Sequence, residues 1–231
     1  MKKLSLLTLL VLLLCAACDK PAPKPTPENP NTPDTPAAPP ANPEKEWMVK
    51  RMTIDATDYT KWVYLNFTTG KLVEVTDPAN DLSWDLGLHR YDFKTNGGES
   101  GVGKGAAVRI SKQKILTEEI PTPKDTQWEL DRQGQLLMQF EDDGLGSHRT
   151  KYEMQEANFL LSSECDGSGG FLNKGIITQE GMPPQVYIDN AIFLIRTASG
   201  EIVRLRVLDF QDNKKHRGYI TIQYAMLVDK K

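Results

Sequence analysis

The sequence predicts an all-β domain of many short antiparallel strands with little helix, over residues 46–231. Short segments in which apolar and polar residues alternate recur along this region, and a period of two is typical of strands with one buried face. Turn-forming residues separate these segments at intervals of about eight to twelve residues, as in all-β domains. Helical periodicity is scarce, and residues 112–120 are the best helical candidate.

The N-terminus is typical of an exported protein. Two lysines precede an apolar run from Leu4 to Leu14, which is shorter than the roughly 20 residues that a membrane-spanning helix needs. We therefore interpret residues 1–17 as a cleaved signal peptide. Ala17 before Cys18 resembles the lipobox of bacterial lipoproteins, which implies that Cys18 is lipidated. The alternative is ordinary secretion, with Cys18 lost or free.

Residues 18–45 are interpreted as the lipidated cysteine and a disordered linker. Ten of the chain's 15 prolines fall in this segment, among Ala, Thr, Asn and Lys. Such a composition cannot bury enough apolar surface to offset chain entropy, so we expect an extended stalk that lifts the domain from a membrane.

The first strands of the domain are predicted at residues 47–54, 62–67 and 72–75. The central stretch, residues 81–108, then shows alternation at Trp84, Leu86 and Leu88 and again at Tyr91 and Phe93. Asn96-Gly97-Gly98 is a strong turn signal, because Asn and Gly tolerate positive φ. We predict a core hairpin that turns there and returns along residues 106–110.

The glycines that follow this turn, up to Gly105, allow a second backbone to run close to a bulky group. Gly98 to Lys104 also fits G-x-x-x-x-G-K, the start of a phosphate-binding loop. However, Gly105 stands where that motif has Ser or Thr, and the segment joins two predicted strands rather than opening a helix. These departures argue against nucleotide binding.

Later segments follow the same strand pattern. Residues 131–134 look like a hairpin turn between strands at 128–130 and 136–140, and His148 opens a strand at 150–154. A second hairpin is predicted from strands 191–196 and 202–210 around the turn 197–201. A last long strand is predicted at 219–228.

Composition excludes several functional classes. The net charge is −3 and no basic patch carries interleaved aromatics, so nucleic-acid binding is not expected. Cleavage of the signal peptide leaves two cysteines, Cys18 and Cys165. We expect no intramolecular disulfide, because Cys18 is interpreted as lipidated. Cys165 lies in a predicted loop without a nearby histidine. No motif of a hydrolase or transferase is present, so an enzyme is not predicted.

Two places could bind a ligand. His148, Tyr152 and Met154 share one face of the predicted strand, whereas His89 and His216 are interpreted as structural or solvated. The second place is the loop around Met182, a long apolar side chain between Gly181 and two prolines that stiffen the backbone. Met182 could also pack down as a loop anchor, and the sequence leaves both possibilities open.

The central stretch from Trp84 to Ala107 resembles the HmuY family of haem-binding lipoproteins. The similarity extends from the lipoprotein start through Ile54-Asp55-Ala56 and residues 62–67 to Asp209-Phe210-Gln211-Asp212 and residues 218–221. The resemblance implies an almost wholly β fold and one haem, gripped between two loops by two axial side chains.

Alignment with the family pattern implies which residues are the axial haem ligands. Tyr152 matches the family's tyrosine, so His148 falls on the first histidine position. Glu180 occupies the second histidine position of the family pattern, and the side chain of Met182, two residues later, can reach the same space. Other members with Met-Pro-Pro in this loop are thought to use two methionines, which makes Met154 the partner. The resemblance therefore implies Met182 with Met154 or His148, and we favour Met154.

The resemblance also implies a biological role. The expected protein is a haemophore, lipid-anchored at the outer membrane, that takes haem b from host carriers and delivers it to a TonB-dependent outer-membrane receptor. Candidate walls of the haem site are Tyr152, Phe159, Phe171 and Ile176, which could equally belong to the core. Two axial ligands leave no open iron position for catalysis. The alternatives are a lipoprotein that binds a glycan or protein through Trp47 or Trp128 without haem and, less favoured, an enzyme acting on haem.

Overall fold

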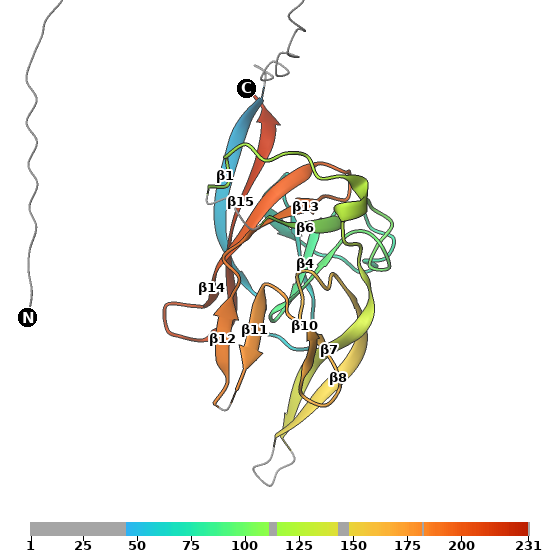
Figure 1. Cartoon of the computed structure of the whole chain (residues 1–231), viewed down its shortest axis with the longest axis vertical. Coiled ribbons are helices and arrows are strands. Elements are labelled where there is room, and N and C mark those ends of the chain that lie inside the picture. The colour runs from blue at the N-terminus through green and yellow to red at the C-terminus, as the bar shows by residue number, and fades with distance from the viewer. Residues whose placement is uncertain (1–44, 111–114, 143–147, 182, 231) are drawn as a thin grey trace, which may run out of the picture. The chain divides into compact units, whose positions relative to one another are not determined.

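The computed structural model describes residues 45–110, 115–142, 148–181 and 183–230 (Figure 1). Residues 42–231 form one compact unit. Its described part is almost wholly β, which confirms the predicted fold class, and contains a single turn of 3-10 helix, η1 (Asp125–Gln127). Residues 115–120 are not helical, contrary to the predicted helical candidate, whose residues 112–114 lie outside the described part. No helix among the described residues is long and apolar enough to cross a membrane.

The largest sheet has five antiparallel strands in the order β1-β15-β14-β13-β6. Their bounds are β1 (Lys45–Asp55), β6 (Ala106–Ile110), β13 (Ile192–Arg196), β14 (Ile202–Gln211) and β15 (Arg217–Asp229). β1 and β15 pair without interruption from Lys45↔Asp229 to Asp55↔Tyr219, and β13 pairs with β14 as a hairpin. The predicted strands 47–54, 191–196, 202–210 and 219–228 are confirmed.

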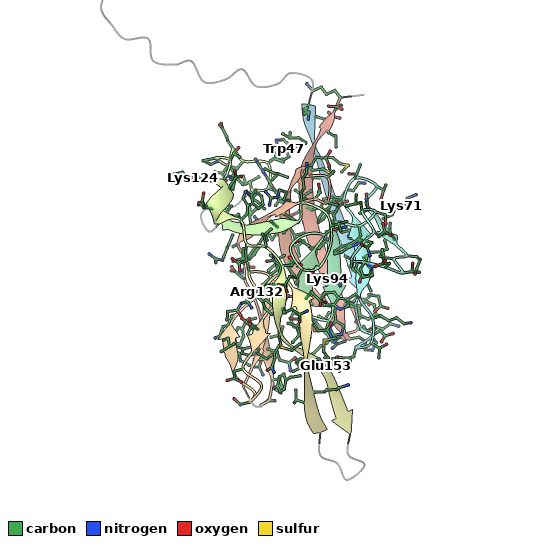
Figure 2. All side chains as sticks on the ribbon, turned by 90° about the vertical axis from the view of Figure 1, so that its right-hand side faces the viewer. Trp47, Lys71, Lys94, Lys124, Arg132 and Glu153 are labelled. Carbon is green, nitrogen blue, oxygen red and sulfur yellow. The ribbon has the colours of Figure 1, made fainter. Side chains whose placement is uncertain are left out.

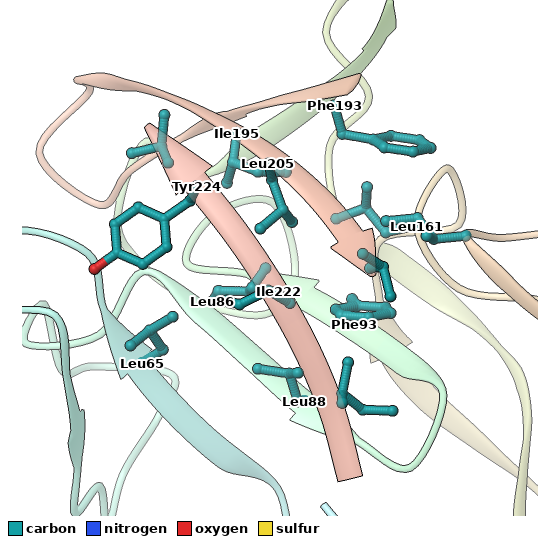
Figure 3. Packing of buried hydrophobic residues seen from close by; sticks show 14 of the residues in the cluster. Leu65, Leu86, Leu88, Phe93, Leu161, Phe193, Ile195, Leu205, Ile222 and Tyr224 are labelled. Atoms are coloured by element: carbon teal, nitrogen blue, oxygen red, sulfur yellow. The ribbon is translucent and has the colours of Figure 1, made fainter. Parts of the chain in front are cut away.

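A second sheet has four strands in the order β3-β2-β4-β5. These are β2 (Val63–Asn66), β3 (Lys71–Val73), β4 (Leu86–His89) and β5 (Asp92–Thr95). Figure 3 shows the main core, in which Leu86, Leu88 and Phe93 of this sheet pack with Leu205 and Ile222 of the first. All five side chains are buried, and each contributes roughly 1.5–3 kcal/mol by leaving water.

The predicted core hairpin is wrong in its turn and in its return strand. β4 pairs with β5, and the chain reverses at Arg90 and Tyr91, where Arg90 adopts a φ of 53°. Residues 106–110 form β6 in the other sheet, paired with β13. Arginine is an uncommon residue at positive φ, so residue preferences did not mark this turn.

The glycine-rich segment is explained by close backbone packing. A Cβ on Gly97 would lie 2.2 Å from the Gly105 carbonyl oxygen, and one on Gly98 would lie 2.2 Å from that of Asp131. The Asn96 amide donates to the carbonyls of Asp81 and Trp84 and fixes the start of the segment. The predicted close approach is present, but the neighbours are backbone atoms rather than a bulky group.

Two further hairpins and a short ladder position the candidate site (Figure 1). They comprise β7 (Arg132–Asp142) with β8 (His148–Ala157), β9 (Glu164–Cys165) with β10 (Phe171–Asn173), and β11 (Ile177–Glu180) with β12 (Gln185–Ile188). Figure 2 places Arg132 against the body of the domain and Glu153 further out along the β7–β8 hairpin. The predicted strand 150–154 lies within β8. The turn predicted at 131–134 is wrong, because residues 132–134 belong to β7.

Candidate ligand-binding site between two hairpins

A cavity of about 80 Å³ lies between the β7–β8 hairpin and the β11–β12 hairpin. We call it the inner cavity. Leu137, Phe171 and Ile177 form its apolar wall, from β7, β10 and β11. Its polar wall comes from the turn between β4 and β5 and from the ends of neighbouring segments, and includes Tyr59, Arg90, Tyr91, Asp92, Ser163, Cys165 and Gln179.

The titratable groups of the inner cavity leave it with positive charge. Burial raises the pKa of Asp92 to about 8, against a hydrogen bond from the Ser163 backbone N–H that lowers it. Burial also raises the pKa of the Cys165 thiol to about 11. Both groups are therefore neutral at pH 7, and Arg90 is the charged residue in the lining.

An open hollow adjoins the inner cavity on the side of β8, and we call it the outer hollow. Met154 and Leu172 line it with Gln135, Glu164, Cys165 and Asp166. Met154 is 56% exposed and Leu172 is 68% exposed, which is unusual for two apolar side chains that face the same hollow. Cys165 lines both spaces, so the outer hollow and the inner cavity lie on either side of this residue.

The alternation predicted for β8 is confirmed by its pairing. Tyr152 lies opposite Leu137 and Met154 lies opposite Gln135, so Tyr152 and Met154 share the face that borders the two spaces. The Tyr152 hydroxyl approaches Gly169, and burial raises the pKa of this phenol. The other face of β7 and β8 packs Leu136 and Ala157 into a small core with Phe159.

The structure does not bring together all of the residues expected at the site. His148 is the first residue of β8, but only its backbone is described. Met182 and Cys18 lie outside the described residues. Glu180 lines the opposite side of β11 and forms an ion pair with Lys174 at 2.5 Å.

The four candidate wall residues have different surroundings in the structure. Phe171 lines the inner cavity, and Tyr152 lies on the face beside it. Phe159 and Ile176 are buried in hydrophobic clusters away from these spaces, which is the core position that the sequence also allowed. Leu137 and Ile177 line the cavity instead, and only the packing of hairpin against hairpin reveals them.

The remaining histidines and the cysteine have structural surroundings. His89 is fully buried and its Nε2 lies 2.8 Å from the Tyr59 carbonyl oxygen, whereas His216 is exposed beside Asp212. Cys165 is a free thiol in β9 rather than in a loop. In the described ranges, no group of three or more His, Cys, Asp or Glu side chains could hold a metal ion.

Comparison with known proteins gives a consistent result. The family model for HmuY protein matches residues 58–224. The fold is similar to that of the Tannerella forsythia apo HmuY analog, with 19% identity over 82% of this chain and 100% of that chain and a TM-score of 0.57. It is also similar to a Bacteroides vulgatus protein described as HmuY-like and heme-binding, with 21% identity over 76% of this chain and 90% of that chain (TM-score 0.52).

A Bacteroides fragilis protein described as a lipoprotein matches with 21% identity over 76% of this chain and 88% of that chain (TM-score 0.54). No curated protein matches the chain.

Proposed function

The chain belongs to the HmuY family, and we propose that it is a lipid-anchored outer-membrane haemophore that binds haem b and delivers it to an outer-membrane receptor. The observation that carries this proposal is the exposed Met154 thioether, which faces the outer hollow beside the inner cavity. A family member whose solved fold is similar is described as heme-binding, which supports the same ligand.

The residues present fit a porphyrin. Met154 and Leu172 offer apolar contacts to a flat hydrophobic ring, and Leu137, Phe171 and Ile177 extend this surface inward. The inner cavity, at about 80 Å³, is well below the roughly 300–1,000 Å³ of typical ligand pockets. The ring would therefore lie against the open surface between the hairpins, where Met154 is accessible.

We propose Met182 and Met154 as the axial ligands, with His148 as the alternative to Met154. Bound haem would supply the iron that these side chains coordinate. A thioether is a soft, neutral ligand that favours ferrous over ferric iron. We therefore expect tighter binding of reduced than of oxidised haem. Occupation of both axial positions would leave the protein a carrier rather than an enzyme.

The site is tested by a visible absorption titration of the full chain with haem, first in air and then with dithionite. Methionine ligation predicts narrow α and β bands of six-coordinate iron only after reduction, and their loss in Met154→Leu and Met182→Leu. Met52→Leu, the same change at a partly buried β1 position packed against the main core, is the matched control and should leave the spectrum unchanged.

Other outcomes have defined meanings. If low-spin bands form in air and disappear in His148→Ala, then His148 rather than Met154 is the ligand that pairs with Met182. A spectrum identical to free haem in both oxidation states would overturn the haem proposal and favour a glycan or protein partner. The structure gives that alternative little support, because Arg204 lies over the Trp47 ring at 3.9 Å and Arg196 lies over the Trp128 ring at 5.0 Å.

Anchoring and delivery are separate proposals. Cys18 would carry the lipid, and residues 18–45 would give the domain its reach from the membrane. Cys18→Ala should release the protein from the membrane fraction without changing the haem spectrum. A Cys18→Ala protein that stays in the membrane fraction would count against this anchor.

A further inference from the structure

The polar wall of the inner cavity contains a cation without an acidic partner. Arg90 has a φ of 53°, and its Nη1 donates to the carbonyls of Thr57 at 3.1 Å and Arg217 at 3.3 Å. Its guanidinium lies 4.2 Å from the centre of the Tyr59 ring. Within the described ranges no carboxylate forms a salt bridge with it. Hydrogen bonds from Thr57 lower the pKa of the Asp55 carboxyl and Arg90 is near enough to contribute, but no ion pair among the described residues neutralises the cation.

A second polar group of the same wall has no hydrogen bond. The Tyr91 hydroxyl is buried and finds no partner among the residues that the structure describes. Burying a hydroxyl without a hydrogen bond costs its full desolvation penalty, which exceeds the net contribution of a typical hydrogen bond, so such groups call for an explanation. The Arg90 Cζ lies 5.6 Å from the centre of the Tyr91 ring, so the cation lies near the ring that carries the unpartnered hydroxyl.

The charges around the two spaces differ in sign. Asp92 and Cys165 are neutral at pH 7, so the lining of the inner cavity carries the charge of Arg90. The outer hollow carries the carboxylates of Glu164 and Asp166, and Arg132 pairs with Glu164 at 2.7 Å. An anionic group is therefore attracted toward the inner cavity and gains no free cation at the outer hollow.

We propose that Arg90 and the Tyr91 hydroxyl form a carboxylate subsite, which receives a propionate group of the bound porphyrin. This inference rests on the proposed function and deepens it, because it sets which edge of the ring enters the space between the hairpins. An arginine and a phenol together supply a charge and directed donors for a carboxylate. The hydrogen bonds from Arg90 Nη1 to the carbonyls of Thr57 and Arg217 hold this cation at the turn.

The test compares haem with haem dimethyl ester, whose propionates are uncharged, on the full chain and on Tyr91→Phe. We expect Tyr91→Phe to weaken haem binding about tenfold, or about 1.4 kcal/mol. Binding of the ester should be unchanged. The ligand-free variant should be as stable as wild type or more so, because the lost hydroxyl has no protein partner. Tyr187→Phe, at a 58% exposed tyrosine of β12, is the matched control.

Arg90→Gln is the second variant and should weaken haem binding more than Tyr91→Phe while also sparing the ester. Because Arg90 holds two backbone carbonyls, its ligand-free stability must be measured alongside. Equal haem affinity in Tyr91→Phe and wild type, or an ester that binds wild type as tightly as haem does, would overturn the subsite alone. A wild-type protein that binds neither compound would overturn the proposed function and the subsite with it.

Discussion

Asp92→Asn should stabilise the protein, and by an amount that grows with pH. The Asp92 carboxyl is 7% exposed beside the inner cavity, and burial raises its pKa from 3.8 to about 8. The folded state therefore holds a proton that the unfolded chain releases above about pH 4. Stability from this group is fully present below the unfolded pKa and is lost as pH rises through the folded pKa.

The magnitude follows from this linkage. Each pH unit inside the window costs at most about 1.4 kcal/mol of unfolding free energy, so the whole window amounts to on the order of 5 kcal/mol. Asparagine is isosteric with the protonated carboxyl and does not titrate, so the stability of the variant does not fall with pH through this group. The difference between variant and wild type should widen from pH 5 to pH 8 and level off above the folded pKa.

Urea unfolding at pH 5, 6, 7 and 8 measures this difference directly. Asp166→Asn is the matched control, because hydrogen bonds from Ser168 lower the pKa of that exposed carboxyl and place its effect below about pH 4. A difference between Asp92→Asn and wild type that stays constant across the series would show that Asp92 is ionised in the fold. The neutral lining that we assign to the inner cavity would then be wrong.

Three further predictions concern the fold around the site. Gly98→Ala should lower the free energy of unfolding in urea by at least about 3 kcal/mol, because φ is 59° and a Cβ would lie 2.2 Å from the backbone. Gly169→Ala should cost only about 1–2 kcal/mol, because φ is 99° but the nearest atom to a Cβ lies at 3.7 Å. Equal losses in the two variants would contradict the steric argument. Burial lowers the pKa of His89, so stability should fall as pH drops below about 6.5, and His89→Gln should flatten that fall between pH 7 and pH 5. Cys165 should react slowly with iodoacetamide in the native protein and rapidly in urea, since burial raises its pKa to about 11; native reaction at the rate of a free thiol would contradict this.

Alternation along single strands could be predicted because it depends only on local sequence. Strand β1 follows it closely, whereas β13 is a continuous apolar run in which Ile192 to Ile195 are all buried. The turn between β4 and β5 was missed, although apolar residues change from even positions, ending at Leu88, to odd positions, beginning at Tyr91. That change of phase was the available signal. This signal was weaker than the turn signal of Asn96-Gly97-Gly98, whose glycines instead allow close packing against the backbone of Gly105 and Asp131.

The cavity could not be predicted from the sequence in the same way. Neighbouring residues on a strand point to opposite faces, so an error of one position reverses a residue's environment. Ile176 was expected at the wall, but Ile177 occupies it. Arg90 and Tyr91 reach the cavity because the β4–β5 turn docks against hairpins formed by residues far along the chain. Such docking leaves no local pattern.

The pairing along β8 connects the choice of axial ligand with the carboxylate subsite. Tyr152 lies opposite Leu137, which lines the inner cavity. Met154 is two residues from Tyr152, about 7 Å along the strand, whereas His148 is four residues away in the other direction, about 13 Å. Methionine ligation would thus hold the iron nearer to Arg90 and Tyr91. We expect each of the single variants Met154→Leu and Tyr91→Phe to weaken haem binding. If His148 is the ligand instead, Tyr91→Phe should lose its effect, so the two measurements check each other.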